Sequence, residues 1–160
     1  MAVVSTALAL PKATAPGPLI VLHPGSGGSC PNWPLRSFLE LARGLRGAGR
    51  AVAVTTGFRD RELAESIRRE ETGADSLPIF EGDLPDLAAI LHEASLVVSN
   101  STGPLHLAAA LGTPTLALHA PWPTCGPVRW GPYAGNGWAL VADHPEARRI
   151  KTRMRAIISS

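Results

Sequence analysis

The stretch that decides the fold runs from Val97 to Pro114 and reads VVSNSTGPLHLAAALGTP. It combines a buried apolar strand, a short polar turn, a helix that begins near Thr102 and the start of another strand. At the start of such a helix the backbone N–H groups lack intrahelical partners and the helix dipole is positive, so the turn favours a phosphate. His106 lies one helical turn beyond Thr102 on the same face. The stretch therefore predicts an anion-binding turn between a strand and a helix.

The rest of the chain repeats this alternation of strands and helices. Its apolar runs are short and nearly continuous, which is typical of parallel strands that are buried on both faces. The expected strands are residues 19–22, 51–54, 77–80, 96–98, 115–118 and 138–141, and helical patterns cover 35–45, 59–71, 84–94 and the residues from 145 onward. The alternation predicts an α/β fold in three layers, with a parallel, doubly wound sheet and any ligand at the carboxyl ends of the strands.

Composition and charge limit the classes of protein to which the chain can belong. The chain has 160 residues, of which 45% are hydrophobic and 18% are charged, and this fits one compact domain over residues 19–160. Residues 1–18 are expected to form a flexible arm or linker, because they contain prolines, a glycine and small residues. The apolar start has no basic flank and is too short to span a membrane, so it indicates a signal peptide only weakly. The net charge of +2, with no long Lys/Arg run, argues against a nucleic-acid partner.

The two cysteines and the histidines give no sign of a metal site. Cys30 and Cys125 fall in separate loops and lack the CxxC spacing of a zinc or redox site. The sequence therefore predicts two free thiols in a reducing compartment. The histidines show no metal-ligand spacing, so no metal site is predicted.

A second loop that suits a phosphate follows the first expected strand and reads HPGSGGS over residues 23–29. Gly25 and Gly27 let the backbone approach a ligand closely, and Ser26 offers a hydroxyl. In a doubly wound sheet the strand before Ser101 would neighbour the first strand, so both loops could close on one ligand. The alternative is that the glycines serve only a tight chain reversal.

The polar turn also has alternatives that involve no ligand. Thr102 could simply cap its helix, with Pro104 in the first turn, and an isolated histidine such as His106 is more often a satisfied buried residue. The position of His106, one turn into a helix that faces a cleft, favours a site residue.

Other polar residues give weaker signals. Asp60 and Glu62 follow the second strand, where an acidic residue often binds a ribose, although solvated charges on a helix surface are the favoured interpretation. The loop at 121–133 combines prolines with aromatic residues and resembles a lid or a binding surface. Its Arg129 could neutralise a phosphate, but a loop arginine is more often just exposed.

Together these motifs carry a family resemblance. HPGS at 23–26, WP at 33–34, SNSTGPLHLAAA at 99–110 and GTPT at 112–115 resemble the carboxyl-terminal half of the lipopolysaccharide heptosyltransferases, glycosyltransferase family nine. The resemblance covers almost the whole chain from Leu19. It implies a GT-B architecture, in which two Rossmann-like domains face each other and the carboxyl-terminal one binds a nucleotide-sugar donor, typically ADP-heptose.

The resemblance also implies an activity and a set of site residues. Family members are metal-independent, need no cofactor and transfer the sugar to a lipopolysaccharide acceptor, so we expect a cytoplasmic location with peripheral association at the inner membrane. Ser26 and Gly27 would lie near the donor, Thr102 and Gly103 would hold the diphosphate, and His106 would support the leaving group. The remaining expected donor-binding residues are Gly25, Ser101 and Glu62.

The chain departs from the family pattern at several points. Ser101 stands where members commonly have an aspartate that contacts the donor sugar, Pro31 where they usually have a basic residue, and Ala120 where they have a glycine. The amino-terminal acceptor domain and its catalytic base have no counterpart in these residues, so a partner domain in the same or another chain is expected. The alternative is a non-catalytic nucleotide-sugar-binding module, and a sugar-nucleotide epimerase ranks below both because only the architecture supports it.

Overall fold

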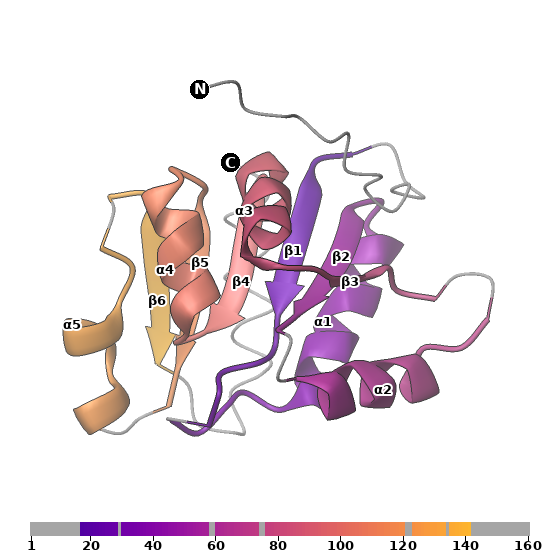
Figure 1. Ribbon diagram of the computed structural model, residues 1–160, viewed down its shortest axis with the longest axis horizontal. Helices are drawn as coiled ribbons and strands as arrows, with labels where there is room; N and C mark the ends of the chain where they lie inside the picture. The colour runs from indigo at the N-terminus through magenta and orange to yellow at the C-terminus, as the bar shows by residue number, and fades with distance from the viewer. Residues whose placement is uncertain are drawn as a thin grey trace.

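The computed structural model describes residues 17–28, 30–57, 60–73, 76–120, 123–133 and 135–141. They form a parallel sheet of six strands in the order β3-β2-β1-β4-β5-β6 (Figure 1). The strands are β1 Leu19–His23, β2 Ala51–Thr56, β3 Ile79–Glu81, β4 Leu96–Asn100, β5 Thr115–His119 and β6 Gly137–Val141. The predicted parallel, doubly wound sheet is therefore confirmed, and the edge strand β3 is shorter than the apolar run at 77–80 suggested.

Helices connect the strands. They are α1 Leu35–Gly47, α2 Arg61–Glu70, α3 Leu84–Glu93, α4 Gly103–Ala110 and α5 Pro127–Trp130, and the 3-10 turn η1 covers Pro123–Cys125. The predicted start of α3 is confirmed, because the Asp83 side chain accepts a hydrogen bond from the Asp86 N–H at 3.0 Å and Pro85 occupies the first turn. Residues 1–16 of the predicted arm (1–18) and the predicted last helix from 145 onward lie outside the described residues.

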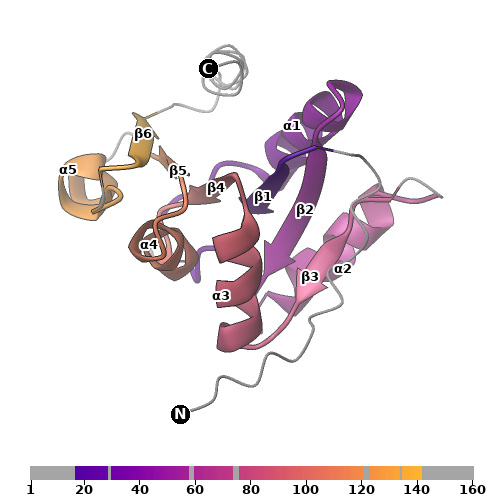
Figure 2. The same cartoon turned by 90° about the horizontal axis from the view of Figure 1, so that it is seen from above.

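The core lies on both faces of the sheet, as expected of three layers. On one face Phe38 of α1 and Ile67 of α2 pack against Leu22 and its neighbours, and on the other Ile90 of α3 and Ala108 of α4 pack against alternate strand residues. Figure 2 shows α1 on one side of the sheet and α3 and α4 on the other. The central strands are thus buried on both faces, which explains their continuous apolar runs. In the described part of the chain, no helix is both long and apolar enough to cross a membrane.

Candidate functional site

The candidate site lies at the carboxyl ends of β1 and β4. These strands pair in parallel, with His23 opposite Ser99, so the glycine loop after β1 and the polar turn after β4 emerge side by side (Figure 1). The helix after β1 covers one face of the sheet and the helix after β4 covers the other. This is the switch point of a doubly wound sheet, where a crevice opens for a ligand. The predicted neighbourhood of the two loops is confirmed.

The glycine loop turns tightly after β1. Gly27 and Gly28 have φ values of 63° and 81°, a left-handed conformation that favours glycine. The Gly28 N–H donates to the Ser26 hydroxyl oxygen at 3.3 Å. The tight chain reversal is therefore real, and it leaves Ser26 at the wall of the crevice.

Gly25 is required by a close approach of another loop. A Cβ atom at this position would lie 2.3 Å from the Asp60 Oδ2 atom, which itself accepts a hydrogen bond from the Gly57 N–H at 3.1 Å. Asp60 immediately precedes α2, and its carboxylate lies against the loop after β1. The close approach of Asp60 therefore explains why position 25 has no side chain.

Asn100, the last residue of β4, fastens the two halves of the site. Its Nδ2 atom donates to the Pro24 carbonyl at 2.8 Å, and its Oδ1 atom accepts from the Trp33 N–H at 2.9 Å. All of these groups are buried. Asn100 therefore fixes the glycine loop and the entry to α1 relative to the polar turn after β4.

The start of α4 keeps its polar groups available. Thr102 is the N-cap residue, but its side chain makes no capping hydrogen bond, and only its carbonyl accepts from the Leu105 and His106 N–H groups. Within the described residues, no hydrogen bond uses the N–H groups of Thr102 or Gly103. Pro104 has no N–H to satisfy. The expected anion-binding geometry is thus present, with two amides and a hydroxyl unoccupied.

These groups line one pocket with a volume of about 520 Å³. Its lining brings together five of the predicted residues, Ser26, Ser101, Thr102, Gly103 and His106, and adds residues from the loop after β5, Thr124, Cys125, Arg129 and Trp130, as well as Cys30. Gly25 and Gly27 belong to the same glycine loop but do not line this pocket, and Glu62 is an exposed residue in the first turn of α2. A pocket of this size suits a small ligand such as a nucleotide.

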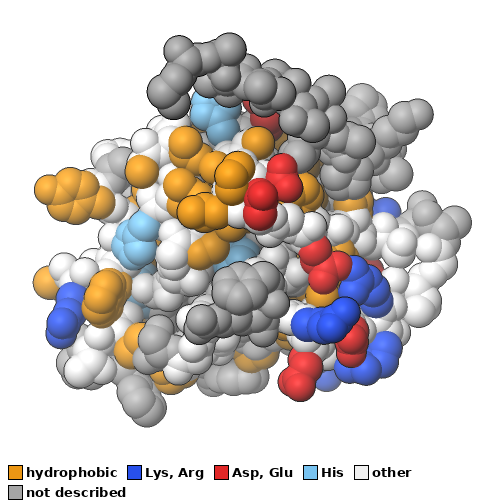
Figure 3. Space-filling view, viewed as in Figure 1, with side chains coloured by type: hydrophobic (Ala, Val, Ile, Leu, Met, Phe, Trp, Pro, Cys, Tyr) orange, Lys and Arg blue, Asp and Glu red, His pale blue; other side chains and the backbone are white. Residues whose placement is uncertain are grey.

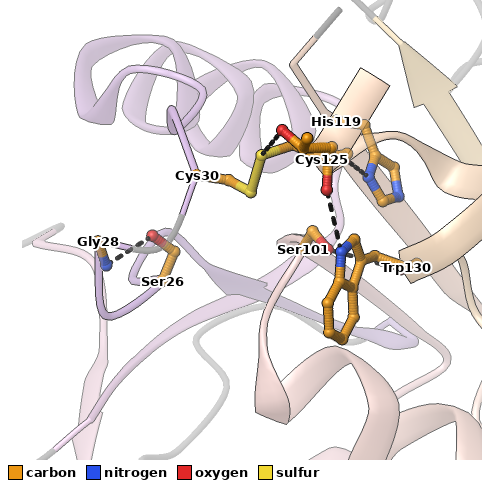
Figure 4. Close-up of a disulfide and its surroundings, with 8 residues drawn as sticks. Ser26, Gly28, Cys30, Ser101, His119, Cys125 and Trp130 are labelled. Carbon is orange, nitrogen blue, oxygen red and sulfur yellow. Dashed lines mark hydrogen bonds between the residues drawn. A yellow bond between two sulfur atoms is a disulfide. The ribbon is translucent and has the colours of Figure 1, made fainter. Parts of the chain in front are cut away.

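The prediction of two free thiols is wrong. Cys30 and Cys125 form a disulfide, with their Cα atoms 6.0 Å apart (Figure 4). The bridge joins the loop after β1 to the loop after β5, and both sulfur-bearing residues line the pocket. Sequence spacing did not reveal the pair because the cysteines are 95 residues apart, but parallel strands bring both loops to the same edge of the sheet.

The loop after β5 is braced against the polar turn. The Trp130 indole N–H donates to the Thr124 carbonyl at 3.1 Å, and the Ser101 hydroxyl donates to the Trp130 carbonyl at 3.5 Å (Figure 4). Together with the disulfide, these bonds give the pocket a second wall, built from Thr124–Trp130. Sequence reasoning singled out this Pro- and aromatic-rich loop without showing which residues face the pocket.

His119, at the end of β5, was missed by the sequence reasoning. Its Nδ1 atom lies 2.8 Å from the Cys125 carbonyl, which can only accept, so Nδ1 carries the proton. Burial lowers the pKa of His119, although the bond to Cys125 opposes this and nearby His106 acts in the same direction as burial. The buried Nε2 atom has no partner among the described residues. A neutral histidine with an unused acceptor therefore lies near His106.

His23, at the end of β1, is buried beneath the glycine loop. Its Nδ1 atom lies 2.9 Å from the Thr55 hydroxyl oxygen. Burial lowers its pKa to about 4, a shift that Asp60 and the contact with Thr55 oppose. The ring is therefore neutral near neutral pH and serves to join β1 to β2. Among the described residues, no cluster of three or more His, Cys, Asp or Glu side chains could hold a metal ion.

Comparison with known proteins agrees with this architecture. A putative glycosyltransferase of Haemophilus influenzae is 33% identical over 116 residues, which cover 71% of this chain and 33% of that protein. Lipopolysaccharide heptosyltransferase 2 of Salmonella typhimurium is 29% identical over 109 residues, or 65% of this chain and 31% of that protein. The chain thus spans about a third of the length of these curated relatives.

Solved structures show the same fold. E. coli heptosyltransferase WaaC with ADP superposes with a TM-score of 0.74 at 24% identity, covering 92% of this chain and 46% of that one. A glycosyl transferase family 9 structure from Veillonella parvula gives a TM-score of 0.68 at 25% identity, covering 87% and 38%. The profile of glycosyltransferase family 9 (heptosyltransferase) matches residues 2–156. The chain therefore belongs to glycosyltransferase family 9, the heptosyltransferase family.

Proposed function

We propose that this chain binds the nucleotide-sugar donor of a heptosyltransferase-like glycosyltransferase, and that the donor is an ADP-sugar. The observation that carries the proposal is the single pocket shared by Ser26, Ser101, Thr102, Gly103 and His106 at the switch point. Membership of family 9 and the fold shared with a heptosyltransferase solved with ADP support it. The diphosphate of the donor would lie over the unused amides of Thr102 and Gly103.

The same arrangement suits the chemistry of sugar transfer. When the bond between sugar and diphosphate breaks, the leaving diphosphate gains negative charge, and donors already fixed in place stabilise that charge without rearranging. The amides at the start of α4 supply such donors. His106, one turn further along the helix, would support the leaving group, with its ring near the neutral His119. In this proposal the chain's own groups, without a cofactor, stabilise the departing charge.

Calorimetry with ADP and ADP-sugars tests the proposal. Gly103→Val should weaken or abolish ADP binding, because a Cβ at Gly103 meets no protein atom within 4 Å and the new side chain would occupy ligand space. Thr102→Val should weaken binding by removing the hydroxyl. Gly44→Val is the matched control, because Gly44 is an exposed residue of α1 with no atom within 4 Å of a built Cβ. The proposal would be contradicted if the natural chain showed no saturable binding of ADP or ADP-sugars, or if all variants bound ADP with equal affinity.

Ser101 bears on the choice of donor sugar. A serine at this position has no carboxylate to accept hydrogen bonds from sugar hydroxyls, and its own hydroxyl already donates to the Trp130 carbonyl. We therefore expect weak discrimination among donor sugars, or a preference for a sugar other than ordinary heptose. Affinities for a series of ADP- and GDP-linked sugars measure this, and a strong preference for ADP-heptose would contradict it.

The second candidate is a nucleotide-sugar-binding module without catalytic activity. Ser101 and Pro31 favour it, because each lacks a charged group that the family resemblance leads one to expect. Sugar transfer to a lipopolysaccharide-type acceptor distinguishes the two candidates. Transfer by the purified chain, assayed alone and with an added amino-terminal acceptor domain, that is lost on His106→Ala would remove the non-catalytic candidate.

The proposed partner of the donor site is an amino-terminal acceptor domain, in the same or another chain, which would supply the catalytic base. The proposed location is the cytoplasm, with peripheral association at the inner membrane. The Cys30–Cys125 disulfide argues against that location, because disulfides are rare in reducing compartments. The redox state of the pair in cells is therefore a direct test of the location.

A further inference from the structure

The pocket needs positive charge if it binds a diphosphate, and its lining residues supply little of it. Seven of them contribute neutral hydroxyl, backbone or disulfide groups, and the His106 and Trp130 rings add no permanent charge. Among the described residues that line the pocket there is no carboxylate, and Arg129 has the one permanently charged side chain. The charge inventory therefore singles out Arg129, which lies in α5, in the pocket wall built from Thr124–Trp130.

Arg129 is available for a ligand. None of the ion pairs within the described residues involves it; they join Arg36, Arg43, Arg68 and His92 to acidic side chains elsewhere. Figure 3 shows blue but no red over α5 on this face of the molecule, whereas red and blue are mixed over α2. The Arg129 guanidinium therefore keeps its full set of N–H donors for an incoming anion.

The guanidinium is also held in place. Its central carbon lies 5.3 Å from the centre of the Trp130 ring, a cation–π distance. The ring is fixed by the indole bond to the Thr124 carbonyl, and the adjacent Cys125 is tied by the disulfide to Cys30. Less conformational freedom is then lost when a ligand binds, because the wall that presents Arg129 is already ordered.

We propose that Arg129 binds the diphosphate of the ligand through its guanidinium, together with the amides at the start of α4. Arginine binds phosphate oxygens in a bidentate manner, with charge-assisted hydrogen bonds. Arg129 is then the residue that selects nucleoside diphosphates over uncharged nucleosides. This inference rests on the proposed function, since it assigns a ligand group within the same pocket.

The test compares ADP with adenosine by calorimetry on the full chain. Arg129→Ala should weaken ADP binding by about ten- to a hundred-fold, which is the range for losing charge-assisted hydrogen bonds, and should leave adenosine binding within about two-fold. Arg129→Lys should fall between the natural chain and Arg129→Ala, because it keeps the charge and loses the bidentate geometry. The ADP affinity of Arg129→Ala should also depend less on salt concentration than that of the natural chain.

Arg36→Ala is the matched control. Arg36 is an exposed residue of α1 whose ion pair is with Glu40, one helical turn away, and its loss should change neither affinity. Equal ADP affinity in the natural chain and Arg129→Ala would overturn the inference while leaving the proposed function intact. Equal losses for ADP and adenosine would overturn it too, because Arg129 would then act through pocket shape. Failure of the natural chain to bind either ligand would overturn both proposals.

Discussion

Asn100 joins the two loops of the site through one side-chain amide. Asn100→Ala would leave the Trp33 N–H and the Pro24 carbonyl buried without partners. An unsatisfied buried polar group costs about 1–3 kcal/mol, so we expect the free energy of unfolding to fall by about 2–4 kcal/mol. Denaturant unfolding measures this. Asn32→Ala, at an exposed position in the neighbouring loop, is the control, and equal stability of the two variants would contradict this role of Asn100.

The lowered pKa of His23 leads us to expect that the free energy of unfolding depends on pH. Its pKa is about 4 in the folded chain and about 6.5 when unfolded, so the unfolded state binds more protons between these values. Stability should therefore fall as the pH drops through this window, by at most about 3 kcal/mol from this residue, and the effect should be complete below pH 4.

Replacing the ring isolates this contribution. His23→Gln keeps a group that can bond to the Thr55 hydroxyl but does not titrate, so the free energy of unfolding should vary less between pH 4 and 6.5 than in the natural chain. Part of the slope should remain, because the pKa of His119 is lowered as well. An unchanged slope would show that His23 is not buried in its neutral form.

At the residue scale, the sequence predicted those site residues whose position depends only on their own helix or loop. Thr102, Gly103 and His106 are placed by helix geometry alone, and Ser26 by its loop after a strand. Asn100 and His119 could not be assigned in the same way, since their partners are the Pro24 and Cys125 carbonyls and the Trp33 N–H. Any residue type can supply a backbone N–H or carbonyl, so the sequence of the other loops does not reveal these partners.

At the scale of elements, the disulfide is the covalent link between the loop after β1 and the loop after β5, and both of its cysteines line the pocket. Closing a loop of this length restricts the unfolded chain, and such bonds typically stabilise a domain by about 2–4 kcal/mol. We expect the Cys30→Ser, Cys125→Ser double variant to lose that stability and to bind ADP less tightly. The natural chain treated with a reductant should match the variant, which should itself be insensitive to the reductant.

Thiol counting checks the premise and the proposed location together. The purified chain should show no reactive thiol before reduction and two after it, because both cysteines are in the bridge. Rapid alkylation in intact cells followed by mass spectrometry then reports the state of the pair. Alkylation of both cysteines in cells would show reduced thiols and support a cytoplasmic location. Resistance of both cysteines to alkylation would show an intact disulfide and exclude the cytoplasm as the resident compartment.

At the element scale the strands were predictable and the connections across loops were not. Continuous apolar runs placed β1, β2, β4 and β5 to within two residues, because both faces of these strands are buried. β3 deviates since Leu77 is buried without joining the sheet. The cysteines looked unrelated because loop pairing depends on the strand order, and the order β1-β4-β5 brings their two loops within reach.

At the scale of the whole molecule, the strand order sets one switch point, and the pocket lies there between helices on opposite faces of the sheet. The chain spans about a third of the length of its curated relatives, so donor binding and sugar transfer need separate tests. We predict that the purified chain binds the donor but transfers no sugar until an amino-terminal acceptor domain of a family member is supplied. Transfer by the chain alone would show that it carries its own base.

The most direct test of the central claim is a crystal structure of the chain with ADP. The account predicts the diphosphate within hydrogen-bond distance of the Thr102 and Gly103 amides and of the Arg129 guanidinium. ADP bound away from the switch point, or bound there with its diphosphate turned from the start of α4, would contradict the account.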